Sequence, residues 1–362
     1  MTVTVTQIET VLKSIYDSFL EKNLIDAKLI KNIVVNAGCV SLDLHLPYPS
    51  QTHLNQIKNN ITQTIQNLDP RLALQINASV VVESHAVQMG LKPLPGVKNI
   101  LVVASGKGGV GKSTTAVNLA LALVSEGASV GLLDADIYGP SQPMMLGLSG
   151  QPDIINGELI DPLIGHGLQV MSIGFLIEQD TPMVWRGPMV TRALDQLLNQ
   201  TRWKDLDYLV VDMPPGTGDI QLSLAQKVPV TGAIIVTTPQ DIALLDAKKG
   251  LKMFEKVGVP ILGIVENMAI YQCSQCGHQE HVFGSGGGEH MASTFQVPYL
   301  GGLPLDIKIR EQTDAGVPTV VSSPESAVAQ LYRSIAIKAA AGIAKQAKNH
   351  TLKFPKIVVQ NT

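Results

Sequence analysis

The chain has few cysteines, few charged residues and no long apolar run. Three cysteines among 362 residues are too few for a disulfide framework. Charged residues make up only 16% of the chain, and a formal net charge of −3 gives no global basic field to hold nucleic acid. No apolar run approaches the ~18–20 residues that a membrane span needs. We therefore expect neither nucleic acid nor a membrane as a partner.

The N-terminus also lacks the marks of a secretory signal. Residues 1–6 contain neither a basic segment nor an apolar one. The sequence therefore predicts a cytoplasmic protein. What is abundant is apolar residues, at 45%, and glycine, with 32 positions, a balance that suits an α/β protein with tight strand–helix turns. At roughly 100–200 residues per domain, two domains are expected.

Hydrophobic periodicity divides the chain into two parts. Residues 1–84 mix helical spacing with alternation and predict a small α+β domain. One helical pattern runs from Ile8 to Phe19. Residues 85–97 contain two glycines and two prolines and are predicted to be a linker.

Residues 98–348 show a different pattern, in which short continuous apolar runs alternate with helical stretches. Such runs are typical of strands buried on both faces of a parallel sheet. The sequence therefore predicts a doubly wound, mainly parallel sheet, preceded by the small α+β domain. Residues 349–362 are expected to form a tail. The apolar runs are 100–103, 130–133, 208–211, 233–236 and 261–265.

A phosphate-binding motif lies between the first apolar run and the next helical stretch. Residues 106–113 match G-x-x-x-x-G-K-[ST] in full, whereas a plain glycine turn needs no such pattern. Glycines let the backbone N–H groups turn toward phosphates, and the following helix adds a positive dipole end. Lys112 is expected to reach the β- and γ-phosphates of ATP, and Ser113 to ligate Mg²⁺. The predicted nucleotide-binding residues of this segment are Gly106, Lys107, Gly108, Gly109, Val110, Gly111, Lys112, Ser113 and Thr114.

Two aspartates are expected at the same site. Asp212 follows the run 208–211, and Asp136 follows the run 130–133. Ligands of parallel α/β folds bind at the carboxyl ends of the strands. Asp212 is thus predicted to hold Mg²⁺, and Asp136 to orient an attacking water, although either could instead cap a loop. Lys107 is not required by the motif and could serve a neighbour's phosphates or be solvated.

A pair of cysteines, Cys273 and Cys276, lies outside the phosphate motif. Two thiolates at this spacing can share one metal or one cluster edge, but most sites need four ligands. A second copy of the chain could supply the other two around a [4Fe–4S] cluster. Alternatively, His278 and His281 could complete a zinc site, or the pair could be a redox dithiol or two chance cysteines.

These motifs together resemble the Mrp/ApbC-type iron–sulfur cluster carrier ATPases, of the deviant-Walker P-loop class. The class signature is Lys107–Ser113, and the resemblance covers residues 98–340. The segments closer to the carrier group are 134–141, 185–189, 212–219, 266–268, 273–276, 283–289 and 302–306.

The resemblance implies ATP binding, slow ATP hydrolysis and a homodimer. It implies that Cys273 and Cys276 of both chains hold a labile [4Fe–4S] cluster, received from an assembly scaffold and handed to apoproteins. It further implies that Lys107 reaches the partner's nucleotide, so that Lys107, Lys112 and Asp136 serve catalysis. Asn267 would lie near the adenine.

The N-terminal part resembles a small iron–sulfur assembly domain, with departures. The chain has Asp26-Ala27-Lys28 where that domain has Asp-Pro-Glu, and residues 46–50 lack its usual cysteine. Cys39 is therefore given no cluster role.

Three rival functions remain to be weighed. A positioning ATPase would bind a membrane through a terminal amphipathic helix, or DNA, but the alanine-rich residues 324–348 predict a packing helix. An ATP-gated reductase would hold its cluster with well-separated cysteines, whereas these are close together. A zinc-stabilised scaffold is the third. For a carrier, the loop 212–219 is the predicted link between nucleotide and cluster.

Overall fold

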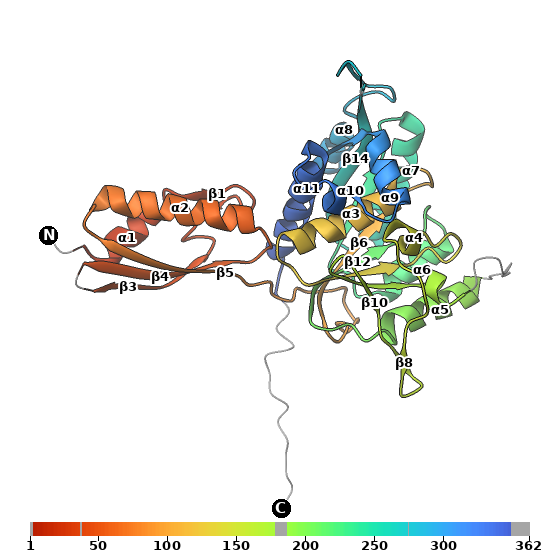
Figure 1. Ribbon diagram of the computed structural model, residues 1–362, viewed down its shortest axis with the longest axis horizontal. Coiled ribbons are helices and arrows are strands. Elements are labelled where there is room, and N and C mark those ends of the chain that lie inside the picture. The colour runs from red at the N-terminus through yellow and green to blue at the C-terminus, as the bar shows by residue number, and fades with distance from the viewer. Residues whose placement is uncertain (1–2, 37, 178–186, 274, 349–362) are drawn as a thin grey trace, which may run out of the picture.

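The computed structural model describes residues 3–36, 38–177, 187–273 and 275–348. Figure 1 shows a small N-terminal unit beside a larger α/β unit. The predicted tail at 349–362 lies outside the described residues, as do Trp185 and Arg186 of the motif 185–189. Among the helices described, none is long and apolar enough to cross a membrane.

The N-terminal unit is a three-stranded sheet covered on one face by helices. Its strands lie in the order β3-β4-β5, with β3 and β4 antiparallel and β4 and β5 parallel. Alternate residues of β4 are buried, as the sequence pattern predicts, and α2 covers that face with a buried stripe at helical spacing. The elements are α1 (Val5–Leu12), β1 (Tyr16–Asp17), β2 (Lys22–Asn23), β3 (Ile30–Asn36), β4 (Cys39–Leu46), α2 (Gln51–Leu68) and β5 (Ala73–Val80).

The first helix is shorter than the helical pattern from Ile8 to Phe19 predicts. It ends at Leu12, and a small hairpin of β1 and β2 follows. The reason is Asp17, whose Oδ1 accepts hydrogen bonds from the backbone N–H groups of Phe19 and Leu20 at 2.9 and 2.8 Å. Such side-chain bonds offer the backbone a turn in place of a helix. The apolar residues beyond Leu12 thus reach the core from a turn.

The larger unit contains a nine-stranded sheet whose path runs β10-β11-β7-β12-β6-β13-β14-β15, with β16 beside β14. All of these pairs are parallel except β10–β11 and β14–β15, so the predicted mainly parallel sheet is confirmed. The strands are β6 (Val97–Ala104), β7 (Val130–Asp134), β10 (Leu163–Gly165), β11 (Leu168–Ser172), β12 (Leu206–Asp212), β13 (Gly232–Thr237), β14 (Ile261–Gln272), β15 (Gln279–Glu280) and β16 (Tyr299–Leu305), and a separate hairpin of β8 (Ile154–Ile155) and β9 (Leu159–Ile160).

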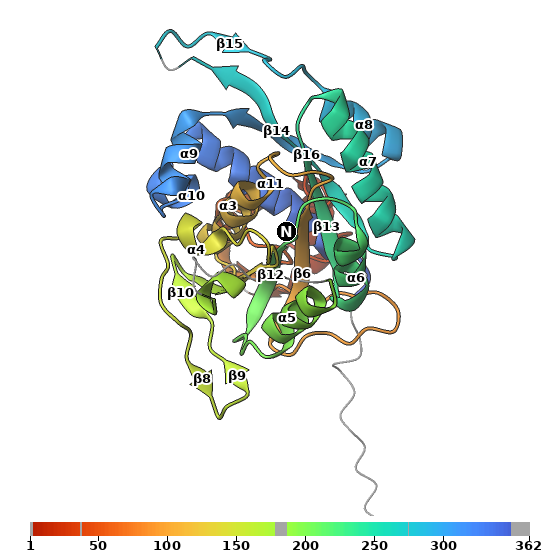
Figure 2. The same ribbon diagram turned by 90° about the vertical axis from the view of Figure 1, so that its right-hand side faces the viewer.

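Helices cover both faces of this sheet, which makes it doubly wound. One buried cluster joins the sheet to α3 and α11, and a second joins the other face to α5, α6 and α7. In Figure 2 the sheet is seen between these two helical layers. The helices are α3 (Lys112–Ser125), α4 (Gln142–Met145), the 3-10 turn η1 (Ile173–Phe175), α5 (Gly187–Asn199), α6 (Asp219–Lys227), α7 (Asp241–Lys256), α8 (Gly287–Phe295), α9 (Ile307–Asp314), α10 (Thr319–Ser322) and α11 (Ala327–Ala344).

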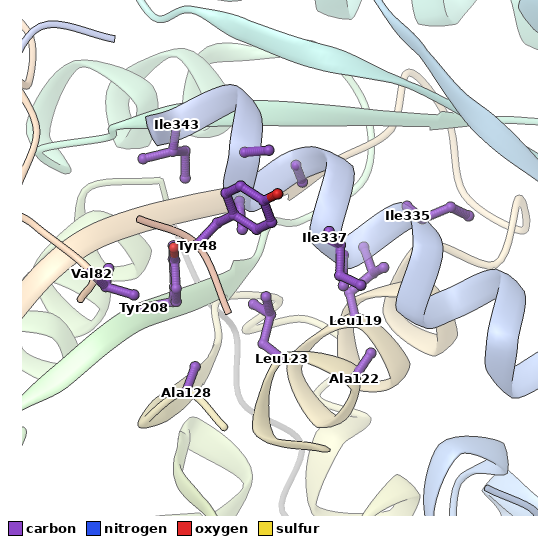
Figure 3. Close-up of a cluster of buried hydrophobic side chains, with 14 of the residues drawn as sticks. Tyr48, Val82, Leu119, Ala122, Leu123, Ala128, Tyr208, Ile335, Ile337 and Ile343 are labelled. Carbon is purple, nitrogen blue, oxygen red and sulfur yellow. The ribbon is translucent and has the colours of Figure 1, made fainter. Parts of the chain in front are cut away.

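Tyr48 lies at the junction between the two units. It is fully buried in a cluster that includes Leu123 of α3 and Ile337 and Ile343 of α11 (Figure 3). Its hydroxyl donates to Asp17 Oδ2 at 2.7 Å. Burial opposes ionisation of Asp17, but hydrogen bonds from His53, Tyr48 and Leu20 outweigh it and hold the pKa of Asp17 below its ordinary value.

Replacing Tyr48 by phenylalanine is expected to destabilise the chain. The buried carboxylate of Asp17 loses one of its donors, and a hydrogen bond to a charged group contributes roughly 1.5–3 kcal/mol. Urea unfolding of the full chain should show a loss of this size in the free energy of unfolding. Tyr16→Phe is the matched control, because Tyr16 is 60% exposed and should be neutral. Equal effects of the two substitutions would contradict this role of the Tyr48 hydroxyl.

Candidate functional site

The phosphate motif forms the turn between β6 and α3. Gly109 and Gly111 have φ of 81° and 79°, the left-handed region that favours glycine. A Cβ on Gly111 would also lie 2.1 Å from Asn267 Nδ2, and one on Gly106 would lie 2.1 Å from the carbonyl carbon of Asp246. Gly106 is therefore required by the close approach of the α7 backbone, and Gly111 by its left-handed φ, in addition to any ligand.

The side chain of Lys112 is buried over this turn. Its Nζ forms an ion pair with Asp212 Oδ1 at the end of β12 and donates to Ser113 Oγ at 3.1 Å. Lys112 is 6% exposed and Asp212 is fully buried. Three of the predicted site residues are thus brought together in one cluster. A phosphate that binds Lys112 must compete with the carboxylate of Asp212.

Gln142, at the start of α4, is a site residue that the sequence reasoning missed. Its side-chain amide donates to Asp212 Oδ2 at 2.9 Å and to the carbonyl of Ser113 at 3.1 Å. Its Oε1 is buried and has no hydrogen-bond partner among the residues that the structure describes. A lone glutamine at the start of a short helix carries no motif, so only the fold reveals it.

Asp134 ends β7, Asp136 follows two residues later, and the two carboxylates have different environments. Asp134 is fully buried and accepts hydrogen bonds from the backbone of Asp136, Ser141 and Gln142 and from the hydroxyl of Ser172, at 3.0–3.1 Å. Burial, and then the charge of Asp212, raise the pKa of Asp134 to about 7. Asp134 therefore fixes the connection between β7 and α4. The carboxylate of Asp136 is half-buried, and burial raises its pKa although the charge of Lys112 opposes this.

The loop 212–219 lies against the phosphate turn. The backbone N–H of Met213 donates to Val103 at 3.1 Å, and that of Gly216 donates to Ser105 at 3.0 Å. The side-chain amide of Gln221 donates to the carbonyl of Pro215. The loop is thus tied to β6 and to the phosphate turn by backbone hydrogen bonds.

The other predicted nucleotide-binding residues lie around the same turn. Lys107 is half-buried and makes no ion pair with the residues described. Thr114 lies in the first turn of α3, where its carbonyl accepts from Asn118. Asn267, predicted near the adenine, is 8% exposed, and its amide donates to the carbonyl of Val110 at 2.8 Å. Asn267 therefore contacts the phosphate turn itself.

The cysteine pair lies at the tip of the hairpin formed by β14 and β15, which projects from the large unit (top of Figure 2). The N–H of Cys273 donates to the carbonyl of His278 at 2.8 Å, and that of Gly277 donates to the carbonyl of Cys273 at 2.9 Å. Cys273 is half-buried and Cys276 is exposed. Hydrogen bonds from the backbone N–H groups of Cys276 and Gln275 lower the pKa of Cys273.

The two histidines of this hairpin do not join the cysteines. His281 Nδ1 lies 2.8 Å from the carbonyl oxygen of Ala269, and His278 is exposed. No group of three or more histidine, cysteine, aspartate or glutamate side chains within the described residues could hold a metal ion. A zinc site completed by His278 and His281 of one chain is therefore not assembled.

Replacing Asp212 by asparagine is expected to remove most of the Mg²⁺ dependence of ADP binding. The variant keeps the shape of the side chain but loses the charge that faces Lys112. Bonds to charged groups contribute roughly 1.5–3 kcal/mol, so the ratio of affinities with Mg²⁺ and with EDTA should fall about tenfold or more. Calorimetric titration measures both affinities.

Asp207→Asn is the control for this titration, because Asp207 lies on the same strand and pairs with Lys98 at the surface. It should bind ADP like the wild type. A full Mg²⁺ effect retained in Asp212→Asn would refute the prediction that Asp212 holds Mg²⁺.

Comparisons with known proteins bear on both units. A family model described as a NUBPL iron-transfer P-loop NTPase matches residues 96–340. A model described as an iron–sulfur cluster assembly protein matches residues 6–73. Both matches agree with the resemblances drawn from the motifs.

Relatives and a solved structure agree with these models. The chain is 56% identical over 285 residues to an iron–sulfur cluster carrier protein of Pseudomonas fragi, a match that covers 78% of this chain and 99% of the relative. It is 50% identical over 323 residues to one of Escherichia coli (strain K12), covering 89% and 88%. A nucleotide-binding protein from Archaeoglobus fulgidus in complex with ADP superposes with a TM-score of 0.56 at 35% identity, covering 64% of this chain and 90% of that chain. The chain therefore belongs to the iron-transfer P-loop NTPases of the NUBPL type, the family of the iron–sulfur cluster carriers.

Proposed function

We propose that this chain binds and hydrolyses ATP and carries a labile [4Fe–4S] cluster, which two copies of the chain hold between them and pass to apoproteins. The observation that carries the proposal is the cysteine pair on an exposed hairpin of a P-loop fold. The family matches support two domains, at 1–84 and 98–348, joined by residues 85–97. The cytoplasmic location stays a prediction, and so does the absence of nucleic-acid and membrane partners.

The cluster is cargo, and one chain supplies half of its ligands. A [4Fe–4S] cluster is commonly held by four thiolates, and each hairpin offers Cys273 and Cys276. No third ligand lies near them within the described ranges. A second copy would supply the missing pair, which makes the homodimer a requirement of the cargo. The lowered pKa of Cys273 favours the thiolate, which is the form that binds metal.

The nucleotide site has the groups that Mg·ATP needs. Lys112 would bind the β- and γ-phosphates, and Ser113 and Asp212 would hold Mg²⁺, which supplies charge neutralisation when bound. The buried, unpartnered Oε1 of Gln142 beside Asp212 suits a donor such as a metal-bound water. Asp136 would orient the attacking water. Lys107, which makes no ion pair with the described residues, is available to a partner's phosphates.

The rival functions fit these features less well. A membrane-positioning ATPase needs an exposed apolar helix, but the apolar residues of α11 are mostly buried against α3 and β16. A reductase must retain its cluster, whereas these cysteines lie on one exposed hairpin. ATP-dependent co-sedimentation with DNA or lipid, or ATP-coupled electron transfer to a partner, would favour one of these rivals.

Anaerobic reconstitution with iron and sulfide tests the cargo. The wild type should give a brown dimer with about four iron atoms per two chains, as one bridging [4Fe–4S] cluster requires. Cys273→Ala and Cys276→Ala should each stay colourless while binding ADP normally. Cys39→Ala is the control, since Cys39 lies on β4 of the N-terminal unit. A colourless wild type, or one that holds only zinc, would remove the carrier function.

Replacing Asp136 by asparagine tests the hydrolytic role. Because the carboxylate would orient and help deprotonate the attacking water, ATP hydrolysis should fall by about a hundredfold, the lower end for general-base catalysis. ADP affinity should stay unchanged. Phosphate release measures the rate, with the exposed Asp153→Asn as the matched control. An unchanged rate in Asp136→Asn would exclude Asp136 from the hydrolytic step.

A further inference from the structure

Strand β14 is kinked halfway between its start and the cysteine hairpin. It runs over Ile261–Gln272 and ends directly before Cys273. Its pairing with β16 shifts register between Glu266 and Ile270. Inside that gap, Met268 has φ of 57°, a left-handed conformation that is uncommon for a residue other than glycine. Irregular strand positions of this kind often re-aim a segment or lie at functional sites. We name residues 266–269 the β14 kink.

The β14 kink touches the phosphate turn on one side. The amide of Asn267 donates to the carbonyl of Val110 at 2.8 Å. A Cβ built on Gly111 would lie 2.1 Å from Asn267 Nδ2 and 4.0 Å from Met268 Cε, so the kink and the turn are in direct contact. Lys112 follows Gly111 in the chain, and a phosphate that binds Lys112 competes with the carboxylate of Asp212. Asn267 therefore contacts the turn directly and would be displaced by a movement of Val110 or Gly111.

The β14 kink is anchored on its other side to α8. Glu266 is 2% exposed, and its carboxylate accepts a hydrogen bond from the backbone N–H of Gly288, in the first turn of α8. The kink therefore lies between the phosphate turn and a helix that holds it in place.

A side chain of the cysteine hairpin reaches back to the β14 kink. His281, on the returning arm, lies with Nδ1 2.8 Å from the carbonyl oxygen of Ala269. A carbonyl can only accept, so Nδ1 carries the proton of this bond. Between this bond and the tip, Tyr271 pairs with Glu280 and Gln272 with Gln279. The hairpin is thus fastened to the kink at two points, the strand itself and His281.

We infer that the β14 kink couples the phosphate turn to the cysteine hairpin, so that nucleotide binding changes how Cys273 and Cys276 are presented, with His281 as the positioning residue. The inference rests on the proposed function for the nucleotide and cluster sites. It assigns the link to β14, in place of the loop 212–219. Among the described residues, the hydrogen bonds of that loop lead to the nucleotide site, to β6 and to α6, and none of them leads to the cysteine hairpin. Those of the β14 kink lead to the phosphate turn and to the cysteine hairpin.

The test is the alkylation rate of the two thiols in the full chain without cluster, followed by mass spectrometry with iodoacetamide as the probe. In the wild type, Mg·ADP should change the rate at Cys273 or Cys276 by about fivefold or more, the lower end of ordinary couplings between sites. His281→Ala should lose most of this change while calorimetry finds the ADP affinity unaltered. His281→Asn should restore it, because the asparagine amide can donate to Ala269 from nearly the same position.

His278→Ala is the matched control, because His278 is an exposed histidine of the same hairpin. It should respond to Mg·ADP like the wild type. A full response retained in His281→Ala would overturn the coupling through His281. The same outcome is expected if Mg·ADP protects the thiols only by making two chains dimerise. A lost response that His281→Asn leaves unrestored would overturn the positioning role of the bond.

The failure of the proposed function is distinguishable from the failure of the coupling. A wild type that binds ADP without any change in thiol reactivity overturns the coupling and leaves the nucleotide site standing. A wild type that binds no ADP removes the nucleotide site, and the coupling with it. Loss of the cluster function is read separately, from the reconstitution of the two cysteine variants.

Discussion

The ends of strands β6, β7 and β12 meet around one buried ion pair, that of Lys112 and Asp212. Both side chains are almost inaccessible to solvent, so neither charge can rely on water for its solvation. Removing one member of such a pair leaves a buried charge without a partner, which costs about 3–5 kcal/mol. Gln142 donates a second hydrogen bond to Asp212, and Asp134 in turn accepts from the backbone N–H of Gln142 at the start of α4. Lys112 is thus held in the site before any anion binds, and an incoming anion would replace Asp212 as its partner.

This arrangement also explains why so much of the site is backbone. The glycines of the turn allow Asp246 and Asn267 to approach closely, and the same lack of side chains leaves N–H groups free to face phosphates. On β14, Asn267 then contacts the turn, and its neighbour Glu266 contacts α8. A substitution at Gly111 would therefore affect the strand that leads to the cysteines as well as the nucleotide site.

The parts predicted from the sequence are those whose signal is contiguous. The phosphate motif, the cysteine pair and the apolar runs of the sheet each lie within a few residues, and the fold class and family follow from them. Asn267 and Val110 are 157 positions apart, and no sequence pattern predicts their contact. The same holds for Gln142 beside Asp212. The early end of α1 was missed because the turn made by Asp17 overrides helical spacing that continues to Phe19.

The placement of the two cysteines bears on what kind of site they form. A resident cofactor is usually enclosed, because burial protects it from solvent and from competing ligands. Here Cys276 is exposed at the tip of a two-stranded arm, and the arm joins the body of the protein through the β14 kink. Two such arms from two chains could approach and separate without unfolding either sheet. Exposed cysteines on such an arm fit the proposed carrier function better than a reductase, which must retain its cluster.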